Sequence, residues 1–175
     1  MAPGTIYTIG HSTHSYPEFL EMLRGFEIQL LADVRNFPGS RKFPHFNSDV
    51  LQSALADDHI AYIHFKALGG RRKPDPESHN TAWRHPAFRG YADYMETAQF
   101  AEAVQRLEET ALKSRVAIMC SEAVWWRCHR SMISDYLKSR SWQVLHIMNP
   151  STVKEHPYTA PARIDNGALT YKSLF

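Results

Sequence analysis

Apolar positions along the chain follow two periodicities in turn, which predicts strands that alternate with helices. Short β-branched and aromatic runs predict strands at 6–9, 29–34, 60–65, 116–119 and 143–147. Apolar residues at helical spacing predict helices over about 15–25, 48–57, 91–113 and 128–139. This order favours one α/β domain with three layers and a mostly parallel sheet of about five strands.

Local signals refine these boundaries. Ser15 and Glu18 have capping-box spacing, and Thr97 is suited to cap a second segment within the helical pattern over 91–113. Asn166-Gly167 predicts a type I′ hairpin near the C-terminus. We therefore expect an α/β domain over residues 1–150 and a hairpin-like extension over 151–175 that packs on the same domain.

Composition narrows the class of protein. The 175 residues are 43% hydrophobic and 22% charged, as is typical of a soluble globular domain, and the net charge of +2 does not by itself indicate nucleic-acid binding. No apolar run is long enough for a membrane span, and the first residues lack the pattern of a secretory signal. Two cysteines give no disulfide framework, so we expect a cytoplasmic protein.

The densest chemistry follows the strand at 116–119. That strand leads into Cys120-Ser121-Glu122, and Cys128-His129-Arg130 opens the next helix. Helical phase places His129 on the inward face, at the edge of the sheet where parallel strands bind ligands. Glu122 is a candidate general base or nucleophile and His129 a candidate acid or base. The structural alternatives are a buried histidine bonded to a carbonyl, and a capping or ion-pairing Glu122.

The two cysteines allow two interpretations. Cys120 at a strand end can act as a thiol nucleophile, because a helix N-terminus and nearby arginines favour the thiolate. Free cysteines are also commonly buried and inert, and this is the interpretation we favour. A metal site from Cys120, Cys128 and His129, joined by His11, would not have one of the usual zinc spacings. We therefore assign no metal ligands.

Two other strands end in polar residues that belong to the same edge. His11 and Ser12 follow the first strand and are suited to bind a phosphate or the polar edge of a base. Asp33 and Arg35 follow the second strand and lead to a loop with Ser40, an arrangement that holds phosphate or forms a structural ion pair. The chain has neither a P-loop nor a dinucleotide-binding glycine motif.

The long connection over 66–90 adds a basic segment. Gly69-Gly70-Arg71 begins a cluster of cationic residues, and aromatic residues such as Tyr91 follow it. Long connections inside compact domains are commonly functional or mobile. Cationic and aromatic side chains together favour an anionic, aromatic ligand such as a nucleotide or a nucleic-acid strand.

Several motifs in order resemble the family called domain of unknown function 488. The resemblance covers about residues 5–148 and rests on five segments: Thr8-Ile9-Gly10-His11-Ser12-Thr13, Asp33-Val34-Arg35 with Pro38-Gly39-Ser40, Leu68-Gly69-Gly70-Arg71, the block from Phe88 to Met95, and Met119-Cys120-Ser121-Glu122 with Cys128-His129-Arg130. It implies a compact α/β domain with a shared polar site, and it carries no established reaction.

The leading hypothesis is an enzyme that hydrolyses a glycosidic or similar bond of a nucleotide or nucleic-acid base. The expected catalytic residues are Glu122, His129 and His11. The expected ligand-binding residues are Ser12, Asp33, Arg35, Ser40, Gly69, Gly70, Arg71, Tyr91, Cys120 and Arg130. The alternatives are a non-catalytic nucleotide or nucleic-acid binding module, and a metal- or thiol-dependent enzyme that uses Cys120, Cys128 and His129. The sequence indicates no cofactor and no oligomeric state.

Overall fold

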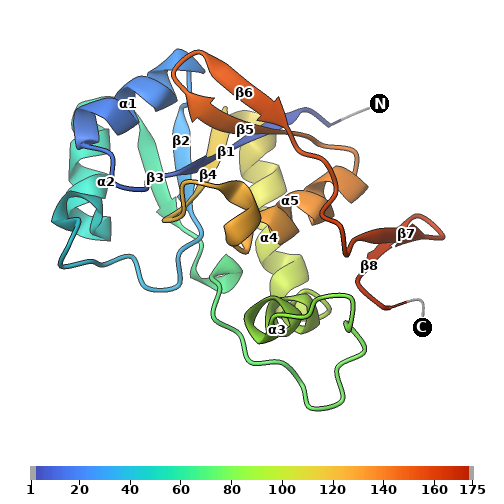
Figure 1. Ribbon diagram of the computed structural model, residues 1–175. Helices are drawn as coiled ribbons and strands as arrows, with labels where there is room; N and C mark the ends of the chain where they lie inside the picture. The colour runs from blue at the N-terminus through green and yellow to red at the C-terminus, as the bar shows by residue number, and fades with distance from the viewer. Residues whose placement is uncertain (1–2, 174–175) are drawn as a thin grey trace.

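A six-stranded sheet forms the middle layer of the computed structural model, which describes residues 3–173 (Figure 1). The strand order is β3-β2-β4-β1-β5-β6, with five parallel strands and β6 antiparallel to β5. The strands are β1 (Thr5–Gly10), β2 (Leu30–Asp33), β3 (Ala61–His64), β4 (Val116–Cys120), β5 (Gln143–Asn149) and β6 (Thr152–Glu155). The predicted α/β class and mostly parallel sheet are confirmed.

Helices cover both faces of the sheet, α1 and α2 on one and α4 and α5 on the other, while α3 lies beyond the strand ends and joins the core of α4 and α5 (Figure 1). From β1 through β3 the chain moves toward one edge of the sheet, and from β3 through β5 it moves back. Because crossover connections are right-handed, this reversal places the later helices on the opposite face. The helices are α1 (Tyr16–Gly25), α2 (Ser48–Asp57), α3 (Pro86–Tyr94), α4 (Ala98–Lys113) and α5 (Arg130–Ser139).

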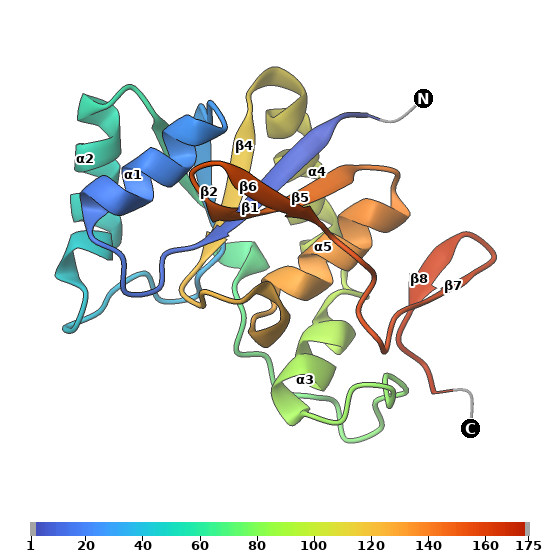
Figure 2. The same ribbon diagram turned by 45° about the horizontal axis from the view of Figure 1, so that its top comes forward.

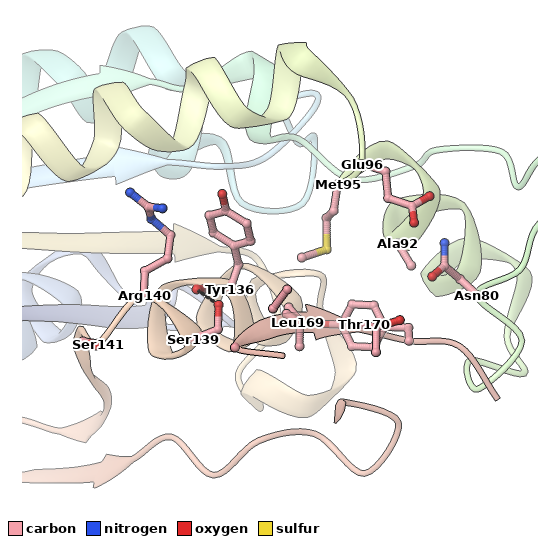
Figure 3. Close-up of a pocket in the computed structure, with 13 residues that line it drawn as sticks. Asn80, Ala92, Met95, Glu96, Tyr136, Ser139, Arg140, Ser141, Leu169 and Thr170 are labelled. Carbon is pink, nitrogen blue, oxygen red and sulfur yellow. Dashed lines mark hydrogen bonds between the residues drawn. The ribbon is translucent and has the colours of Figure 1, made fainter. Parts of the chain in front are cut away.

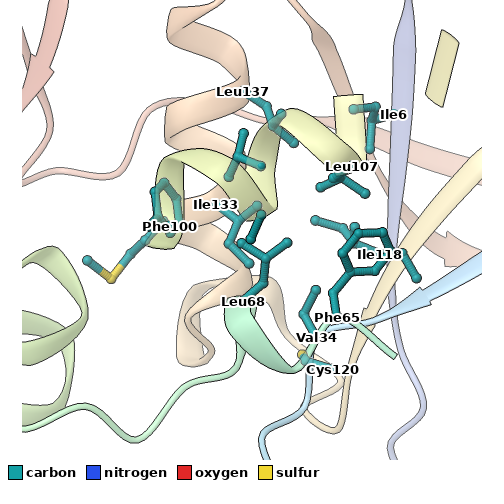
Figure 4. Close-up of a cluster of buried hydrophobic side chains, with 14 of the residues drawn as sticks. Ile6, Val34, Phe65, Leu68, Phe100, Leu107, Ile118, Cys120, Ile133 and Leu137 are labelled. Carbon is teal, nitrogen blue, oxygen red and sulfur yellow. The ribbon is translucent and has the colours of Figure 1, made fainter. Parts of the chain in front are cut away.

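β4 shows how the sheet separates two hydrophobic cores. Val116, Ile118 and Cys120 point into the core that α4 and α5 cover (Figure 4). Ala117 and Met119 point into the core beneath α1 and α2. A strand that is buried on both faces has a continuous apolar sequence, which is why this segment is recognisable from its residues alone.

The predicted helix and turn signals are confirmed. Ser15 and Glu18 form a complete capping box at the start of α1. The Thr97 hydroxyl accepts a hydrogen bond from the N–H of Phe100 and separates α4 from α3. Asn166 and Gly167, with φ angles of 50° and 80°, form the turn between β7 (Arg163–Asp165) and β8 (Ala168–Thr170).

The sequence did not predict β6, the sixth strand. Its four residues include one apolar side chain, Val153, so the segment lacks a recognisable hydrophobic pattern. It forms an edge strand with exposed charged side chains, an arrangement that discourages further strand pairing. Residues of the 151–175 extension therefore contribute to the main sheet, and the β7-β8 hairpin lies beside α5 (Figure 2).

The last predicted helix begins two residues later than expected, at Arg130 rather than Cys128. His129 occupies the N-cap position, so its imidazole and the thiol of Cys128 lie at the start of the helix rather than within its first turn. Within residues 3–173, the helices are too short or too polar to span a bilayer.

Candidate functional site

A pocket of about 770 Å³ opens at the carboxyl ends of β1, β2 and β4. The connection after β1 leads to α1 on one face of the sheet, and the connection after β4 leads to α5 on the other. Adjacent parallel strands whose connections diverge in this way leave a crevice between their ends, which is the usual ligand site of open α/β sheets.

Ten of the thirteen residues predicted for the site line this pocket. They are His11, Ser12, Arg35, Ser40, Gly70, Arg71, Tyr91, Cys120, Glu122 and His129. Asp33, Gly69 and Arg130 do not line it. These three lie directly behind the wall, where Asp33 and Arg130 hold pocket residues in place and Gly69 packs against the backbone of Asn36.

Arg35 is held by a two-pronged ion pair with Asp33. Its Nε donates to Oδ1 at 2.9 Å and its Nη2 donates to Oδ2 at 2.7 Å, and both side chains are buried. The hydroxyl of Tyr62 also donates to Oδ2, at 2.6 Å. The pair uses the edge of the guanidinium that carries Nε and Nη2, which leaves Nη1 directed at the pocket residue His11. Asp33 is therefore a positioning residue for Arg35.

The imidazole of His11 is fixed in one tautomer. Its Nδ1–H donates to the carbonyl of Ser12 at 2.9 Å, so Nε2 carries the lone pair and lies 3.5 Å from Nη1 of Arg35. The ring stacks on Phe46 with centroids 4.3 Å apart. Burial, followed by the charge of Arg35, lowers the pKa of His11 to about 4. The ring is therefore neutral near pH 7.

His129 is oriented in a similar way from the other side of the pocket. Its Nε2–H donates to the carbonyl of Val34 at 2.8 Å, which leaves the lone pair on Nδ1. Nδ1 lies 3.4 Å from Sγ of Cys128, and Gly70 packs against the same edge of the ring. Burial lowers the pKa of His129 below its ordinary value. The sequence allowed His129 to be a buried histidine that bonds to a backbone carbonyl. Nε2 of His129 makes such a bond.

Arg130 holds the loop that carries Glu122. Its buried guanidinium donates from Nη2 to the carbonyl oxygens of Glu122 and Ala123, at 3.2 and 3.3 Å, and from Nη1 to the hydroxyl of Thr8. Gly10 lets the loop pack closely, because a Cβ there would lie 1.7 Å from the carbonyl oxygen of Glu122. Arg130 therefore faces away from the pocket and acts as a positioning residue.

The carboxylate of Glu122 is free to act on a ligand. Glu122 is exposed and lines the pocket. Among residues 3–173, its carboxylate has no cationic partner within ion-pair distance, so the ion pair with Arg127 or Arg130 that the sequence allowed is not formed. The carboxylate is therefore available to contact a ligand in the pocket.

The sequence did not assign two side chains that shape the charge and the surface of the pocket. Arg127 ends a short 3-10 turn over Trp125–Arg127, and Phe37 follows β2 with 66% of its surface exposed. The guanidinium of Arg71 lies 5.8 Å from the centre of the Phe37 ring. Within the described part of the chain, neither Arg71 nor Arg127 pairs with a carboxylate. Exposed residues in loops without periodicity give no sequence signal for such roles.

Two pocket residues have left-handed backbone conformations. Ser12 and Arg71 have φ angles of 47° and 61°, which residues with a Cβ rarely adopt. Both lie at the rim, at the start of a loop that returns to the pocket. Such conformations cost energy and persist where the surrounding structure holds them, often at ligand sites.

The suggested metal cluster is not assembled. Among the residues that the structure describes, no group of three or more histidine, cysteine, aspartate or glutamate side chains is placed to hold a metal ion. Cys120, Cys128 and His129 do share the pocket wall, with contacts between neighbouring side chains. Their arrangement is that of a thiol pair beside an imidazole rather than a set of converging ligands.

A second cavity, of about 510 Å³, lies between α3, α5 and the β7-β8 hairpin (Figure 3). Several polar side chains that line it already form ion pairs or hydrogen bonds with neighbouring residues. Glu96 pairs with His79, Arg140 pairs with Glu108, and Asn80 donates to Asp93. No residue predicted for the site lines this cavity. The pocket at the strand ends is therefore the stronger candidate.

Comparison with protein families gives one match. A family model described as "Domain of unknown function DUF488" matches residues 15–137, which is most of the chain. The matched range contains β2, β4 and the pocket residues from Arg35 to His129, and it begins after His11 and Ser12. Comparison with curated proteins and with solved structures gives no match.

Proposed function

The chain belongs to the family of domain of unknown function DUF488, and we propose that its pocket binds a nucleotide or nucleic-acid base and hydrolyses a glycosidic bond there. The observation that carries the proposal is the composition of the pocket wall. Two unpaired guanidinium groups, of Arg71 and Arg127, lie in the same pocket as an exposed aromatic ring and one free carboxylate.

The cationic side chains favour a phosphate. Arg71 and Arg127 add positive charge without a protein carboxylate to neutralise it, and a guanidinium matches the geometry of phosphate oxygens. The hydroxyls of Ser12 and Ser40 also line the pocket. The Ser40 hydroxyl accepts hydrogen bonds from the backbone N–H groups of Lys42 and Phe43, so its own proton remains available for a ligand.

The aromatic side chains favour a base. Phe37 exposes 66% of its surface at the pocket, which leaves its ring accessible for stacking with a ligand. Phe43 and Phe88 line the pocket as well. Stacking on such rings is tolerant of base identity and contributes about 1–3 kcal/mol per base.

Glu122 has the role of general base in this proposal. Its carboxylate takes a proton from water while the water oxygen bonds to the anomeric carbon of the sugar. The carbon–nitrogen bond breaks and its electron pair moves to the leaving base, which then receives the proton from Glu122. His11 and His129 are neutral, and each presents a lone pair rather than an N–H. The lone pair of His11 faces Nη1 of Arg35 and that of His129 faces Sγ of Cys128, so the two rings position these neighbours instead of supplying a proton.

The binding test uses nucleoside monophosphates and a short single-stranded oligonucleotide with the full-length protein. We expect binding that weakens steeply with added salt, because phosphate contacts release counterions. Arg71→Ala is expected to weaken binding about tenfold. It is also expected to reduce the slope of the logarithm of the binding constant against the logarithm of the salt concentration by about one. Arg163→Ala, at an exposed position in β7, is the matched control. Absence of binding at low salt would contradict the proposal.

The turnover test measures release of free base by chromatography. Glu122→Gln is expected to lower turnover at least about 100-fold while binding persists, because the amide cannot accept the proton. Glu102→Gln, on the exposed face of α4, is expected to keep full turnover. Equal turnover in the Glu122→Gln variant would contradict the catalytic assignment. Binding without base release from any ligand would instead identify a non-catalytic binding module.

A further inference from the structure

Two thiols face each other in the wall of the pocket. Cys120 ends β4 and Cys128 precedes α5, and both line the pocket while being 1% and 7% exposed. The two side chains interact with each other, which shifts the pKa of both thiols. The thiol of Cys120 donates a hydrogen bond to the carbonyl oxygen of Glu122 at 3.6 Å. The proposed hydrolysis uses neither sulfur.

The surroundings of the two sulfurs differ. Sγ of Cys128 lies 3.5 Å from the backbone N–H of Arg130 at the N-terminus of α5, where the helix dipole favours negative charge. Burial disfavours the Cys128 thiolate, but the interaction with Cys120 and the charge of Arg130 outweigh it and lower the pKa of Cys128. Burial and the interaction with Cys128 raise the pKa of Cys120 well above its ordinary value.

The neighbouring imidazole adds an acceptor. His129 is held by the carbonyl of Val34 through Nε2, and its Nδ1 lone pair lies 3.4 Å from Sγ of Cys128. A thiol proton on Cys128 therefore has an acceptor in place, and Cys128 lines the pocket. The limited exposure of Cys128 favours reaction with a small electrophile.

We propose that Cys128 is a peroxide-reactive thiolate of this pocket and that Cys120 is its resolving thiol. The Cys128 thiolate attacks one oxygen of a hydroperoxide, the O–O bond breaks, and the alkoxide or hydroxide leaves and takes a proton. Sulfur is oxidised to the sulfenic acid and the peroxide is reduced to an alcohol or water. The Cys120 thiol then attacks this sulfur, a disulfide forms, and the hydroxyl leaves as water with the proton of Cys120.

The disulfide would have a structural consequence for the pocket. It would connect the end of β4 to the start of α5, so the segment between the two cysteines, which carries Glu122 and Arg127, would become a closed loop. The hydrogen bond between the Arg130 N–H and Sγ of Cys128 would lose its anionic acceptor. Oxidation would thus alter the same wall that the nucleotide proposal uses, although the thiol chemistry does not depend on nucleotide binding.

The test exposes the reduced, full-length protein to hydrogen peroxide and follows its free thiols and its intact mass. We expect both thiols to disappear with a loss of two hydrogen atoms in mass, faster than the thiol of glutathione is oxidised under the same conditions. Cys120→Ser is expected to stop at the sulfenic acid, with a gain of one oxygen atom and trapping at Cys128 by a dimedone-type reagent. In Cys128→Ser, Cys120 is expected to remain a thiol.

A second measurement needs no substitution. Brief alkylation of the unaltered protein near pH 7, followed by peptide mapping, is expected to modify Cys128 at least about tenfold faster than Cys120, because one unit of pKa changes the thiolate fraction about tenfold. Faster modification of Cys120 would overturn the assignment of the two roles. Retention of both thiols after peroxide has oxidised glutathione would overturn the proposal itself.

Discussion

The Nε2–H of His156 donates a hydrogen bond to Oδ1 of Asp135 at 2.8 Å, and both side chains are buried. Asp135 lies in the middle of α5, while His156 follows β6, so the pair ties the extension after residue 150 to the helix. The carboxylate also accepts hydrogen bonds from the N–H and hydroxyl of Thr159 and from the hydroxyl of Tyr171. A single carboxylate therefore anchors three residues of the extension.

The hydrogen-bonded chain continues from His156 toward the pocket. Nδ1 of His156 accepts from Nε2–H of His146 at 2.8 Å, and Nδ1 of His146 accepts from the hydroxyl of Thr8 at 2.5 Å. The Thr8 oxygen in turn accepts from Arg130, the residue that holds the loop of Glu122. Each ring nitrogen of His146 and His156 therefore has a hydrogen-bond partner in this chain. The extension and the pocket loop are thus connected through buried side chains.

Replacing the anchoring carboxylate tests this connection. Asp135→Asn replaces one acceptor oxygen with an NH₂ group that faces other donors, so we expect a loss of about 2–4 kcal/mol in the free energy of unfolding. Urea unfolding followed by circular dichroism measures the loss. Asp165→Asn, at an exposed position in β7, is the control and is expected to change stability by less than about 0.5 kcal/mol. Equal midpoints for the two variants would contradict the anchoring role.

Two buried histidines predict a loss of stability in mild acid. Burial, followed by the charges of His156, Arg130 and Lys154, lowers the pKa of His146 from 6.5 to about 2. The pKa of His11 is lowered from 6.5 to about 4 for similar reasons. Below pH 6.5 the unfolded chain binds protons that the folded chain does not, so folding becomes less favourable as the pH falls.

The expected slope follows from the number of histidines involved. The contribution of the neutral histidines to the free energy of unfolding is fully present above about pH 6.5. Between pH 6.5 and 4 the free energy of unfolding falls by about 1.4 kcal/mol per pH unit for each histidine. Urea midpoints across this range measure the slope. His146→Gln removes one titrating group, while His11 and His129 remain, and is expected to lower the slope by about 1.4 kcal/mol per pH unit. His59→Asn, at an exposed position whose φ of 62° suits asparagine, is expected to keep it. A flat profile in the unaltered protein would refute the prediction.

The sequence was sufficient to predict the fold class and the strand ends that lie together, because both depend on local patterns. Apolar runs define the strands, and parallel strands bring their carboxyl ends together whatever the helices between them do. His11 and Cys120, far apart in the sequence, are thereby neighbours, with the N–H of His11 bonded to the carbonyl of Cys120 at 3.0 Å. Thr97 was recognisable for the same reason, since a cap acts within one turn.

Side-chain direction could not be predicted in this way. Arg130 follows His129 directly, but it turns away from the pocket to Thr8, 122 positions earlier in the chain. That contact requires β1 to lie next to both β4 and β5, which depends on the order of the strands. The role of Asp135 could not be predicted from its position in α5. Its partners, such as His156, belong to an extension whose sequence has no strong hydrophobic pattern.

Arg35→Lys tests whether the buried ion pair depends on a guanidinium. An ammonium group cannot reproduce the two parallel hydrogen bonds to Asp33, and the carboxylate would remain buried with fewer donors. We expect a loss of about 2–3 kcal/mol in the free energy of unfolding. The matched control is Arg24→Lys, because Arg24 forms an exposed ion pair with Asp58 at 3.1 Å. The control is expected to cost less than about 0.5 kcal/mol, and a similar cost in both variants would argue against the special role of Arg35.

Gly70→Ala tests the fit between the long connection and His129. A Cβ at position 70 would lie 2.9 Å from Nδ1 of His129, closer than real Cβ contacts, so the imidazole or the backbone at position 70 must shift and the contact of Nδ1 with Cys128 is disturbed. We expect a loss of about 1–3 kcal/mol in stability and slower alkylation of Cys128, measured by urea unfolding and peptide mapping. Gly39→Ala is the control at another pocket glycine, where the nearest atom to a new Cβ is Oδ1 of Asn47 at 3.9 Å. It is expected to leave both quantities unchanged. If Gly70→Ala behaves like Gly39→Ala, the packing of Gly70 does not position His129.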